Sequence, residues 1–418
     1  MVTARSAGHD QPPAILLGGS ANALSVARSL SRHRVPVVAL NKSTSHVRYS
    51  RHCRWVPLSD DHDVQTVWLD WLTGDGLKAF RGAVVLPCND DGLELIARHR
   101  GLLKNDYVLI EANDEVLLAM LDKAQTYALA EKIGAPMPMS CSVRNREELL
   151  AILDAITYPC ALKPRHSHMF QKHFPGIKLF VARDRHEMMR CYQQVSPHKL
   201  EMLVTEIIPG GEDQYCSYYS YIDEQGRPCF NFTKRKLRQY PNGFGLGTYH
   251  VTDWNPEVAE AGLRFFQGVG LRGLGNVEFK RDARDGQLKL IECNPRFTMV
   301  NELLRLSGLD VSLFVYNRLI GRPLPPMNEY RRGVHVIRPF KDFLAFRASC
   351  RQGELSWGEW LRSLLHPQHL LYFRWTDPWP TIRHTIRLWR DQITTRLMPL
   401  ARRKWLGSSV VTRIIGYL

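Results

Sequence analysis

The sequence of 418 residues lacks several features that would narrow its class at once. It has no low-complexity tract and no internal repeat, which excludes a solenoid, a propeller or a fibrous protein. Nine cysteines are scattered singly, and none stands in a C-x-x-C pair. This spacing argues against a zinc site or a disulfide framework and favours a reducing compartment.

Long apolar segments are also missing. No stretch approaches the roughly 20 consecutive apolar residues that a membrane span needs. Residues 1–11 are polar and mixed, without the apolar core of a secretory signal. We therefore expect a cytoplasmic protein with a short disordered lead.

Acidic residues are scarce in the last fifth of the chain. Residues 331–418 contain 16 Lys and Arg against 5 Asp and Glu, a net charge of +11, whereas the whole chain carries +15. Six of the ten tryptophans lie in the same segment. A Pro- and Arg-rich boundary at 321–332 therefore separates a nearly neutral body from a basic, aromatic extension.

The opening residues alternate between strand and helix patterns. An apolar run at 14–17 ends at Gly18-Gly19-Ser20, a helical pattern follows, and 35–40 has the pattern of a second strand. This order predicts a βαβ unit and an α/β domain with a parallel sheet. The glycine turn either holds an anion at the helix N-terminus or is only the tight turn that the topology needs, and the sequence leaves both open.

The pattern changes after about residue 115. Residues 114–134 have the periodicity of one helix, capped by Asp114 and ended by Gly134 and Pro136. Short extended segments separated by turns follow, which predicts a second domain of the α+β class. The predicted parts of the chain are 1–113, 114–330 and 331–418.

Two glutamates stand on either side of a predicted hairpin turn. Glu278 belongs to an expected strand at 276–280 and Glu292 to one at 288–293, joined by an Asp-Gly pair that predicts a two-residue turn. In that register the glutamates are diagonal neighbours, and a one-residue bulge would bring them directly opposite. Asn294 lies two residues beyond Glu292, on the same face of the strand.

Two carboxylates and an amide oxygen at one point form an all-oxygen site. Such a site suits Mg²⁺, or Mn²⁺, which takes its remaining ligands from water and phosphate. Arg296 emerges beside it, where the guanidinium would meet a phosphate or a carboxylate. The alternative is a pair of solvated strand glutamates before an Asn-Pro turn, but the order of Glu278, hairpin, Glu292 and Asn294 favours the metal site.

Glu292-Cys-Asn-Pro-Arg296 resembles the E-x-N-P-R metal motif of the ATP-grasp superfamily. The similarity continues in the order of that family over roughly residues 14–325. The resemblance implies a three-part ligase fold, in which ATP lies between two α+β lobes after a Rossmann-like N-terminal domain. It is greatest to the carboxylate–amine ligases of the superfamily, a group that includes D-aspartate ligases.

The same resemblance assigns two lysines to the phosphates. Asp122-Lys123 resembles the pair that precedes the central domain, and Lys163 resembles the strand lysine that contacts the α- and β-phosphates. Lys163 ends an otherwise apolar strand, where an unpaired ammonium is costly, so a phosphate partner explains it well. Lys123 lies on a helix of mixed polarity, and an ordinary surface lysine explains it nearly as well.

A segment like the family hinge that holds adenine and ribose follows. Glu206 would accept from the adenine amine, the Ile208 backbone would pair with the ring edge, and Asp213 is placed for the ribose diol. Glu212 is the alternative to Asp213. The glycine-rich flap of the family is missing, and 165–176 stands in its place with cations and a serine that would still hold phosphates.

A second loop is expected at 234–248, which is cationic first and then has glycine at every second position. It would form a mobile strap in which Lys236 or Arg238 clamps an acyl phosphate or a substrate carboxylate. A basic solvated hairpin is the alternative. Its position between the hinge and the metal strands favours a function.

Together these residues predict a ligase. A substrate carboxylate attacks the γ-phosphate of Mg-ATP, Lys123, Lys163 and Arg296 neutralise the developing charge, and an amine then displaces phosphate to give an amide and ADP. Both substrates are expected to be small molecules. A kinase on the same scaffold and a non-catalytic ATP-binding protein are the alternatives.

Apolar residues recur at helical spacing near the C-terminus, with arginines on the other faces. They are Ile382, Ile386, Trp389, Ile393, Leu397 and Leu400. This pattern predicts an amphipathic basic helix, which either lies on a membrane surface or docks on the body with an arginine outer face. Nucleic acid is not expected as a partner, because no recognised binding module accompanies the charge.

Overall fold

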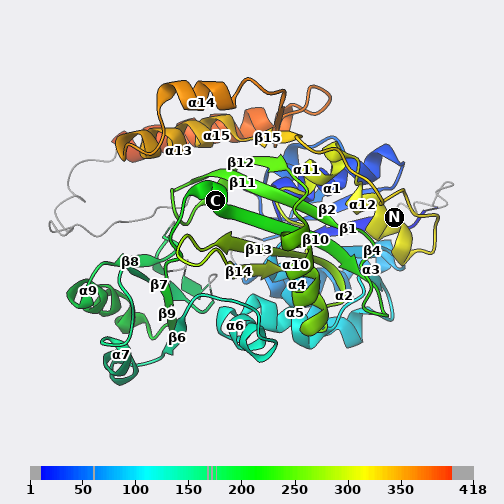
Figure 1. Ribbon diagram of the computed structural model, residues 1–418. Coiled ribbons are helices and arrows are strands. Elements are labelled where there is room, and N and C mark those ends of the chain that lie inside the picture. Colours follow the sequence, from blue (N-terminus) through cyan, green and yellow to red (C-terminus); the bar gives the residue numbers. More distant parts are fainter. Residues whose placement is uncertain (1–10, 60–61, 167–168, 171–172, 176, 398–418) are drawn as a thin grey trace.

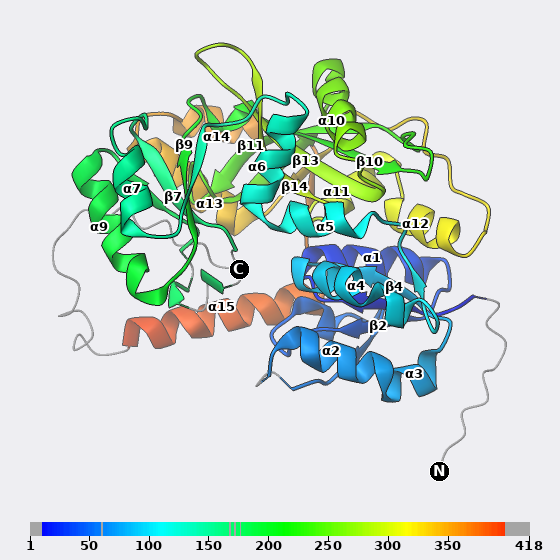
Figure 2. The same ribbon diagram turned by 90° about the horizontal axis from the view of Figure 1, so that it is seen from below.

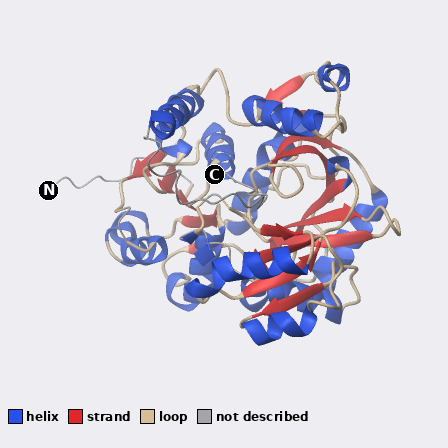
Figure 3. Cartoon of the chain, turned by 90° about the vertical axis from the view of Figure 1, so that its left-hand side faces the viewer, coloured by secondary structure: helices blue, strands red, loops and turns tan. Residues whose placement is uncertain are grey.

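A computed structural model describes residues 11–59, 62–166, 169–170, 173–175 and 177–397. The N-terminal lead, parts of the segment that replaces the flap, and everything after Leu397 lie outside these residues. Within the described part of the chain, the strands form sheets of five, four and seven strands (Figure 1). Figure 3 shows the strands, in red, gathered between helices, in blue.

The first sheet is parallel, with the strand order β3-β2-β1-β4-β5. Its strands are β1 Ala14–Leu17, β2 Val37–Leu40, β3 Arg54–Val56, β4 Val84–Pro87 and β5 Val108–Leu109. Its helices are α1 Ala21–Arg32, the 3-10 helix η1 His46–Tyr49, α2 Val64–Thr73, α3 Asp75–Phe80 and α4 Asp90–Leu103. The predicted βαβ unit is confirmed, because β1 and β2 pair in parallel and α1 connects them. Every residue of β1, β2 and β4 is buried, as expected for a parallel sheet covered on both faces.

The segment expected to be one helix at 114–134 is two helices, α5 Asp114–Leu121 and α6 Lys123–Lys132. Asp122 has extended backbone angles at the junction, and its side chain accepts hydrogen bonds from the backbone N–H groups of Ala124 and Gln125. An aspartate that caps a helix satisfies the amides of the first turn. The hydrophobic period runs across this break, so the sequence pattern did not reveal it.

The second sheet is antiparallel, with the order β6-β9-β7-β8. Its strands are β6 Ser140–Val143, β7 Cys160–Pro164, β8 Phe180–Ala182 and β9 Met202–Glu206. The helices of this lobe are α7 Arg146–Ile152, α9 Arg185–Val195 and the 3-10 helix η2 Ser196–His198. Apolar side chains of the sheet and of both α-helices form a core of their own, which makes this part a compact lobe.

The third sheet has the order β14-β13-β10-β11-β12-β15-β16. Its strands are β10 Tyr215–Ile222, β11 Phe232–Tyr240, β12 Leu246–Thr252, β13 Gly273–Arg281, β14 Leu288–Asn294, β15 His335–Ile337 and β16 Gln368–Leu370. Its helices are η3 Glu212–Gln214, α10 Pro256–Gly268, α11 Asn301–Ser307 and α12 Val311–Leu319.

The prediction that residues 234–248 form a mobile strap is wrong. Most of this segment belongs to β11 and β12, which pair with each other in the middle of the third sheet. Its lysines looked like loop residues, but Lys234 and Lys236 are buried on the sheet and are fixed by it.

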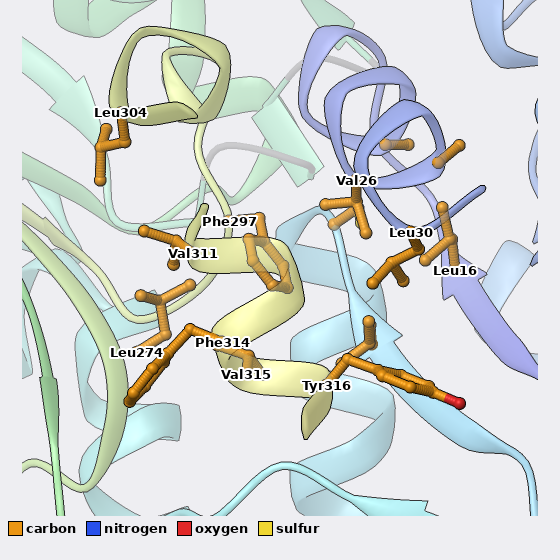
Figure 4. Close-up of a cluster of buried hydrophobic side chains, with 14 of the residues drawn as sticks. Leu16, Val26, Leu30, Leu274, Phe297, Leu304, Val311, Phe314, Val315 and Tyr316 are labelled. Carbon is orange, nitrogen blue, oxygen red and sulfur yellow. The ribbon is translucent and has the colours of Figure 1, made fainter. Parts of the chain in front are cut away.

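One hydrophobic core joins the parallel sheet to the third sheet. Figure 4 shows Val26 and Leu30 of α1 facing Phe297 and the α12 residues Val311 and Val315. Such a continuous core holds the two parts of the chain in one arrangement. It also places the N-terminus of α1 beside the segment that follows β14.

The last part of the chain adds α13 Pro339–Arg351, α14 Trp357–Ser363 and α15 Trp379–Leu397. These helices lie together beyond β12 and β15 (Figure 1), and α15 packs against η1 of the N-terminal sheet. Figure 2 shows α15, in red, beginning beside that domain and extending past it. Among the described residues, no helix combines the length and the apolar character that crossing a bilayer requires.

Candidate functional site

Glu278 and Glu292 lie directly opposite each other on β13 and β14. The prediction of a two-residue turn at Asp285-Gly286 is wrong. The loop between β13 and β14 is longer, and the Asp282 N–H donates to the Gln287 carbonyl across it. The register then shifts by one residue between Glu278 and Phe279. This is the bulge whose effect the sequence predicted, and it brings the two carboxylates to one face.

Lys236 contacts this pair from β11. Its Nζ lies 2.7 Å from Oε1 of Glu278 and 4.3 Å from the centre of the Tyr215 ring. The Lys236 and Glu278 side chains are 7% and 13% exposed, so this is a nearly buried ion pair. Removing one partner of such a pair leaves an uncompensated charge. The structure therefore brings Lys236 to the two glutamates.

Asn294 and Arg296 form a chain of hydrogen bonds next to Glu292. Asn294 Nδ2 donates to Glu292 Oε1 at 3.1 Å, and Arg296 Nη2 donates to Asn294 Oδ1 at 2.9 Å. Arg296 Nε also donates to Asp90 Oδ1 at 2.6 Å, which ties it to the start of α4. Here the Asn294 oxygen faces Arg296, so ligation of a metal by this oxygen requires the amide to turn.

Three further lysines, Lys123, Lys163 and Lys178, interact electrostatically with Glu292. Burial lowers the pKa of Lys163 to about 8, and it lowers the pKa of Lys123 as well; in both cases Glu292 partly opposes the shift. Lys163 Nζ donates to the Tyr127 hydroxyl at 2.8 Å. Burial also lowers the pKa of Lys178 to about 8, again against the effect of Glu292.

These cations determine the charge state of Glu292. Desolvation by the walls of the site opposes its ionisation, but Lys178, Lys236, the Asn294 hydrogen bond and Lys123 outweigh it and lower its pKa. Glu292 is therefore held as an anion, beside the ion pair of Lys236 and Glu278. A divalent cation with an attached polyphosphate matches this arrangement, because the ion satisfies the carboxylates and the phosphates satisfy the lysines.

No group of three or more His, Cys, Asp or Glu side chains is arranged to hold a metal within the described residues. The carboxylates that β13 and β14 bring together are those of Glu278 and Glu292. They fit Mg²⁺, which is commonly held by one or two carboxylates together with substrate phosphates and water.

The hinge residues lie at the end of β9 and just beyond it. Glu206 accepts from the Met139 N–H at 3.2 Å and pairs with Arg284. The Ile208 carbonyl accepts from Lys280 Nζ at 2.8 Å. This lysine is buried on the face that carries Glu278, and it anchors the hinge to the third sheet.

Asp213 and Glu212 occupy different environments. Asp213 is exposed, and its Oδ1 accepts from Gln214 Nε2 at 3.3 Å. Glu212 accepts from the Gly243 N–H, and its other carboxylate oxygen is buried without a hydrogen-bond partner among the described residues. Desolvation raises the pKa of Glu212, although Gly243, Lys236 and Lys280 oppose the shift. Glu212 therefore faces Gly243 and the buried lysines, whereas Asp213 faces solvent.

Arg238 is not in the site. Its Nε and Nη2 donate to the two carboxylate oxygens of Asp342 at 2.8 and 2.9 Å, and it lies over the Tyr249 ring. The register of β11 and β12 shifts on both sides of Arg238, which turns it away from the face of Lys236. The expectation that Arg238 clamps an acyl phosphate is corrected: it attaches the C-terminal extension to the sheet.

Three cations of this site, Lys178, Lys234 and Lys280, were not assigned a role from the sequence. Lys234 and Lys280 stand two residues from Lys236 and Glu278, so the period of two in a strand places them on the same face. Burial lowers the pKa of Lys234 to about 8, and its Nζ donates to Ser217 Oγ at 3.0 Å. Nothing in the local sequence distinguishes Lys178.

Comparison with known proteins begins with sequence. The chain is 24% identical over 327 residues to D-aspartate ligase of Enterococcus faecium, covering 74% of this chain and 77% of that protein. It is 22% identical over 214 residues to the C-terminal section of the carbamoyl phosphate synthase large chain of Methanopyrus kandleri, of which it spans 38%. No model of a protein family matches the chain.

Solved structures agree over a similar length. The biotin carboxylase domain of Hydrogenobacter thermophilus 2-oxoglutarate carboxylase, solved with MgADP and bicarbonate, matches with a TM-score of 0.60 and 17% identity over 78% of this chain and 74% of that one. L-amino acid ligase from Bacillus licheniformis matches with a TM-score of 0.57 and 15% identity over 74% and 75%. The chain has the ATP-grasp fold. The resemblance predicted from the sequence is thus confirmed at the level of the fold.

Proposed function

We propose that this ATP-grasp protein is an ATP-dependent carboxylate–amine ligase. The single observation that carries the proposal is the opposed pair Glu278–Glu292 within a ring of lysines. Among the proteins of similar sequence or fold, one is named D-aspartate ligase and another L-amino acid ligase. A third was solved with MgADP.

Bound Mg-ATP supplies the phosphoryl group that converts a carboxylate to an acyl phosphate, from which an amine displaces phosphate. Glu278 and Glu292 would hold the cation, and Lys163 and Lys123 would neutralise the phosphate oxygens. Arg296, which pairs with Asp90, would neutralise the developing charge on the transferred group together with these lysines. Positioning and charge neutralisation suffice for such transfers, since the protein forms no covalent bond.

The nucleotide base and sugar are assigned to the hinge. Glu206 and the Ile208 backbone would contact adenine, with Arg284 and Lys280 keeping both in place. For the ribose diol we retain Asp213 and add Glu212, whose buried carboxylate oxygen lacks a hydrogen-bond partner in the described structure. A Glu212→Gln variant that keeps the affinity for ATP would return this role to Asp213.

The test is release of ADP and phosphate that requires both an acid and an amine. Pairs drawn from amino acids and small diamines are screened with the full chain, with and without Mg²⁺. Amide formation is followed by mass spectrometry. ADP release with a stable phosphorylated acid and no amide would identify a kinase instead, and ATP binding without turnover for any pair would identify a non-catalytic protein.

We also propose that the chain is divided into 1–113, 114–330 and 331–418. The strand order β3-β2-β1-β4-β5 with helices between parallel strands supports a Rossmann-like first part. The last part contributes β15 and β16 to the third sheet, so it extends the ATP-grasp part and does not form a sheet of its own.

We infer further that α15 contacts a membrane surface peripherally. Of the two alternatives, a membrane-surface helix and a docked helix with arginines outward, the first is supported by exposed apolar residues: Trp379, Ile382 and Ile386 are 56%, 38% and 59% exposed. His384 contacts His46, with ring centroids 3.7 Å apart and the rings tilted by 56°. An outward apolar stripe flanked by the exposed Arg383 suits an anionic bilayer, to which each nearby cation adds about 1 kcal/mol.

Co-sedimentation with vesicles tests this contact. The full chain is mixed with phosphatidylglycerol-containing or pure phosphatidylcholine vesicles. We expect binding to the anionic vesicles that is lost in Ile386→Glu and retained in Leu324→Glu, a matched change at an exposed leucine outside the extension. Equal binding by both variants, or self-association through the stripe without lipid, would overturn the inference.

A further inference from the structure

The loop between β11 and β12 follows a compact path that two glycines allow. It spans residues 241–245 (the 241–245 loop). Gly243 has a φ of 84°, in the left-handed region that favours glycine. A Cβ on Gly245 would lie 2.1 Å from the carbonyl carbon of Tyr240. A side chain at either position would strain or displace the loop, so its shape depends on both glycines.

The Gly243 backbone bonds to the segment that follows the hinge. Its N–H donates to the Glu212 carboxylate, and its carbonyl accepts from the Tyr215 hydroxyl at 2.9 Å. Glu212 belongs to η3 and Tyr215 begins β10, so the loop contacts the junction between the hinge and the third sheet. The Glu212 carboxylate is therefore held in place by the 241–245 loop.

Phe244 extends this contact to the four-stranded lobe. It packs in one apolar cluster with Ile207 of the hinge and with Ala161 and Leu179 of the lobe. Ala161 and Lys163 stand two residues apart on β7, so they lie on the same face of that strand. The 241–245 loop thus contacts the lobe on the face that carries a lysine assigned to the phosphates.

Helix α13 of the C-terminal extension also holds the loop. Asn242 Nδ2 donates to Ser349 Oγ at 2.7 Å, and Ser349 is 9% exposed, so the hydroxyl that accepts this bond is buried. The helix lies beside β11 and β12 (Figure 1), and its Asp342 accepts from Arg238 of β11 at 2.8 Å. Because α13 is anchored to the sheet at Asp342, its last turn offers Asn242 a fixed partner.

The position of Ser349 depends in turn on the packing of the extension. Phe346, one turn earlier on α13, stacks on Trp360 of α14 with ring centroids 4.7 Å apart. Phe346 also meets Trp357 edge-on, with centroids 4.6 Å apart. Residues three apart on a helix lie on the same side, so this aromatic contact is adjacent to the bond between Asn242 and Ser349. The 241–245 loop is thus linked to the packed helices of the extension.

We propose that the C-terminal extension positions the nucleotide hinge through the 241–245 loop, with Asn242 and Ser349 as positioning residues. The inference rests on the proposed function, because that function places adenine and ribose at the hinge. Neither residue touches the nucleotide; both act through Gly243 on Glu212. A loop that is already ordered loses less conformational entropy when a ligand binds, and this raises the affinity. The extension then has a function that does not depend on a membrane.

The test compares a ligand that reaches the hinge with one that does not. Binding of Mg-ADP and of Mg-pyrophosphate to the full chain is measured by calorimetry, because pyrophosphate lacks adenine and ribose. The variants are Asn242→Ala, Ser349→Ala and the double variant. Ser363→Ala is the matched control, because the Ser363 hydroxyl also accepts a hydrogen bond from the sheet, from Arg238 Nη1 at 2.9 Å, but none from the loop.

We expect Mg-ADP to bind about three- to tenfold more weakly to each single variant, which is the effect of one lost hydrogen bond. The double variant should bind no more weakly than the weaker single variant, because both changes remove the same bond. The affinity for Mg-pyrophosphate should not change, and Ser363→Ala should bind both ligands like the wild type. In turnover, the KM for ATP should rise while kcat is kept, since the lost contact acts on binding alone.

Unchanged affinity for Mg-ADP in both single variants overturns the inference. Equal weakening of Mg-ADP and Mg-pyrophosphate does so too, because it shows a general distortion of the site, and so does additive weakening in the double variant. A wild-type chain that binds Mg-pyrophosphate but not Mg-ADP would overturn both the inference and the proposed function. Mg-ADP binding that depends on Asn242 and Ser349, without ADP release for any acid–amine pair, would support the inference and count against the ligase function alone.

Discussion

Replacing Glu292 with glutamine separates the function of the carboxylate pair from its effect on folding. Opposed strand residues have Cβ atoms about 5 Å apart, so two carboxylates there repel by about 3 kcal/mol at an effective dielectric constant near 20. Lys236, at 2.7 Å from Glu278, compensates one of the two charges. The charge of Glu292 is compensated by Lys178, Lys236 and Lys123, which outweigh desolvation and lower its pKa, so the ionised carboxylate also stabilises the ligand-free fold.

Glu292→Gln is therefore expected to lower the free energy of unfolding slightly at neutral pH, because the facing lysines lose part of their compensation. The same change should lower kcat/KM for ADP release by about a hundredfold to a thousandfold, as for loss of one preorganised electrostatic group. Thermal unfolding without nucleotide and steady-state ADP release over a range of Mg²⁺ concentrations measure the two effects. Glu260→Gln makes the same chemical change on the surface of α10, where the side chain is 73% exposed.

Activity of Glu292→Gln above about a tenth of wild type would refute the assignment of the metal site. Loss of activity only in proportion to the loss of folded protein would instead identify Glu292 as a structural residue. Recovery of activity at high Mg²⁺ is expected, because the variant keeps Glu278 and loses affinity for the ion more than it loses geometry.

Three further outcomes are expected. ATP should bind less tightly as pH rises through about 8, because ATP prefers the protonated Lys163 that deprotonates there in the free protein; calorimetry should show this dependence flattened in Lys163→Arg. Asp342→Ala should lower the free energy of unfolding in urea by about 3–5 kcal/mol, because it leaves Arg238 buried without its partner, with ATP affinity unchanged in the folded fraction. Gly247→Ala should lower the free energy of unfolding in urea, because its Cβ would lie 2.1 Å from the buried His250 ring, and a crystal structure would show the ring displaced.

The carboxylate pair illustrates what local sequence predicts well. The two glutamates are close in the chain and are separated only by a hairpin. Strand geometry alone therefore predicted their pairing to within a shift of one residue. The turn was two residues longer than expected, which preserves the facing of side chains because the strand period is two. The bulge then supplied the single-residue shift that aligns them.

Lys236 and Arg238 illustrate what local sequence does not predict. Both are cations two residues apart in one strand, and the same period would place them on one face. Register shifts around Arg238 turn it to Asp342, which lies over a hundred positions away and enters only with the C-terminal extension. The sequence pattern contains no information on the pairing of Arg238 with Asp342. The register shifts that turn Arg238 depend on how β11 pairs with the neighbouring strand β12.

The sequence by itself determined the fold and the proximity of Glu278 and Glu292, because short-range periods and a contiguous motif encode them. Only the tertiary structure decided which cations face the glutamates. It also decided that α15 exposes Trp379, Ile382 and Ile386. Both outcomes depend on packing between parts of the chain that are distant in sequence, and local patterns do not encode such packing.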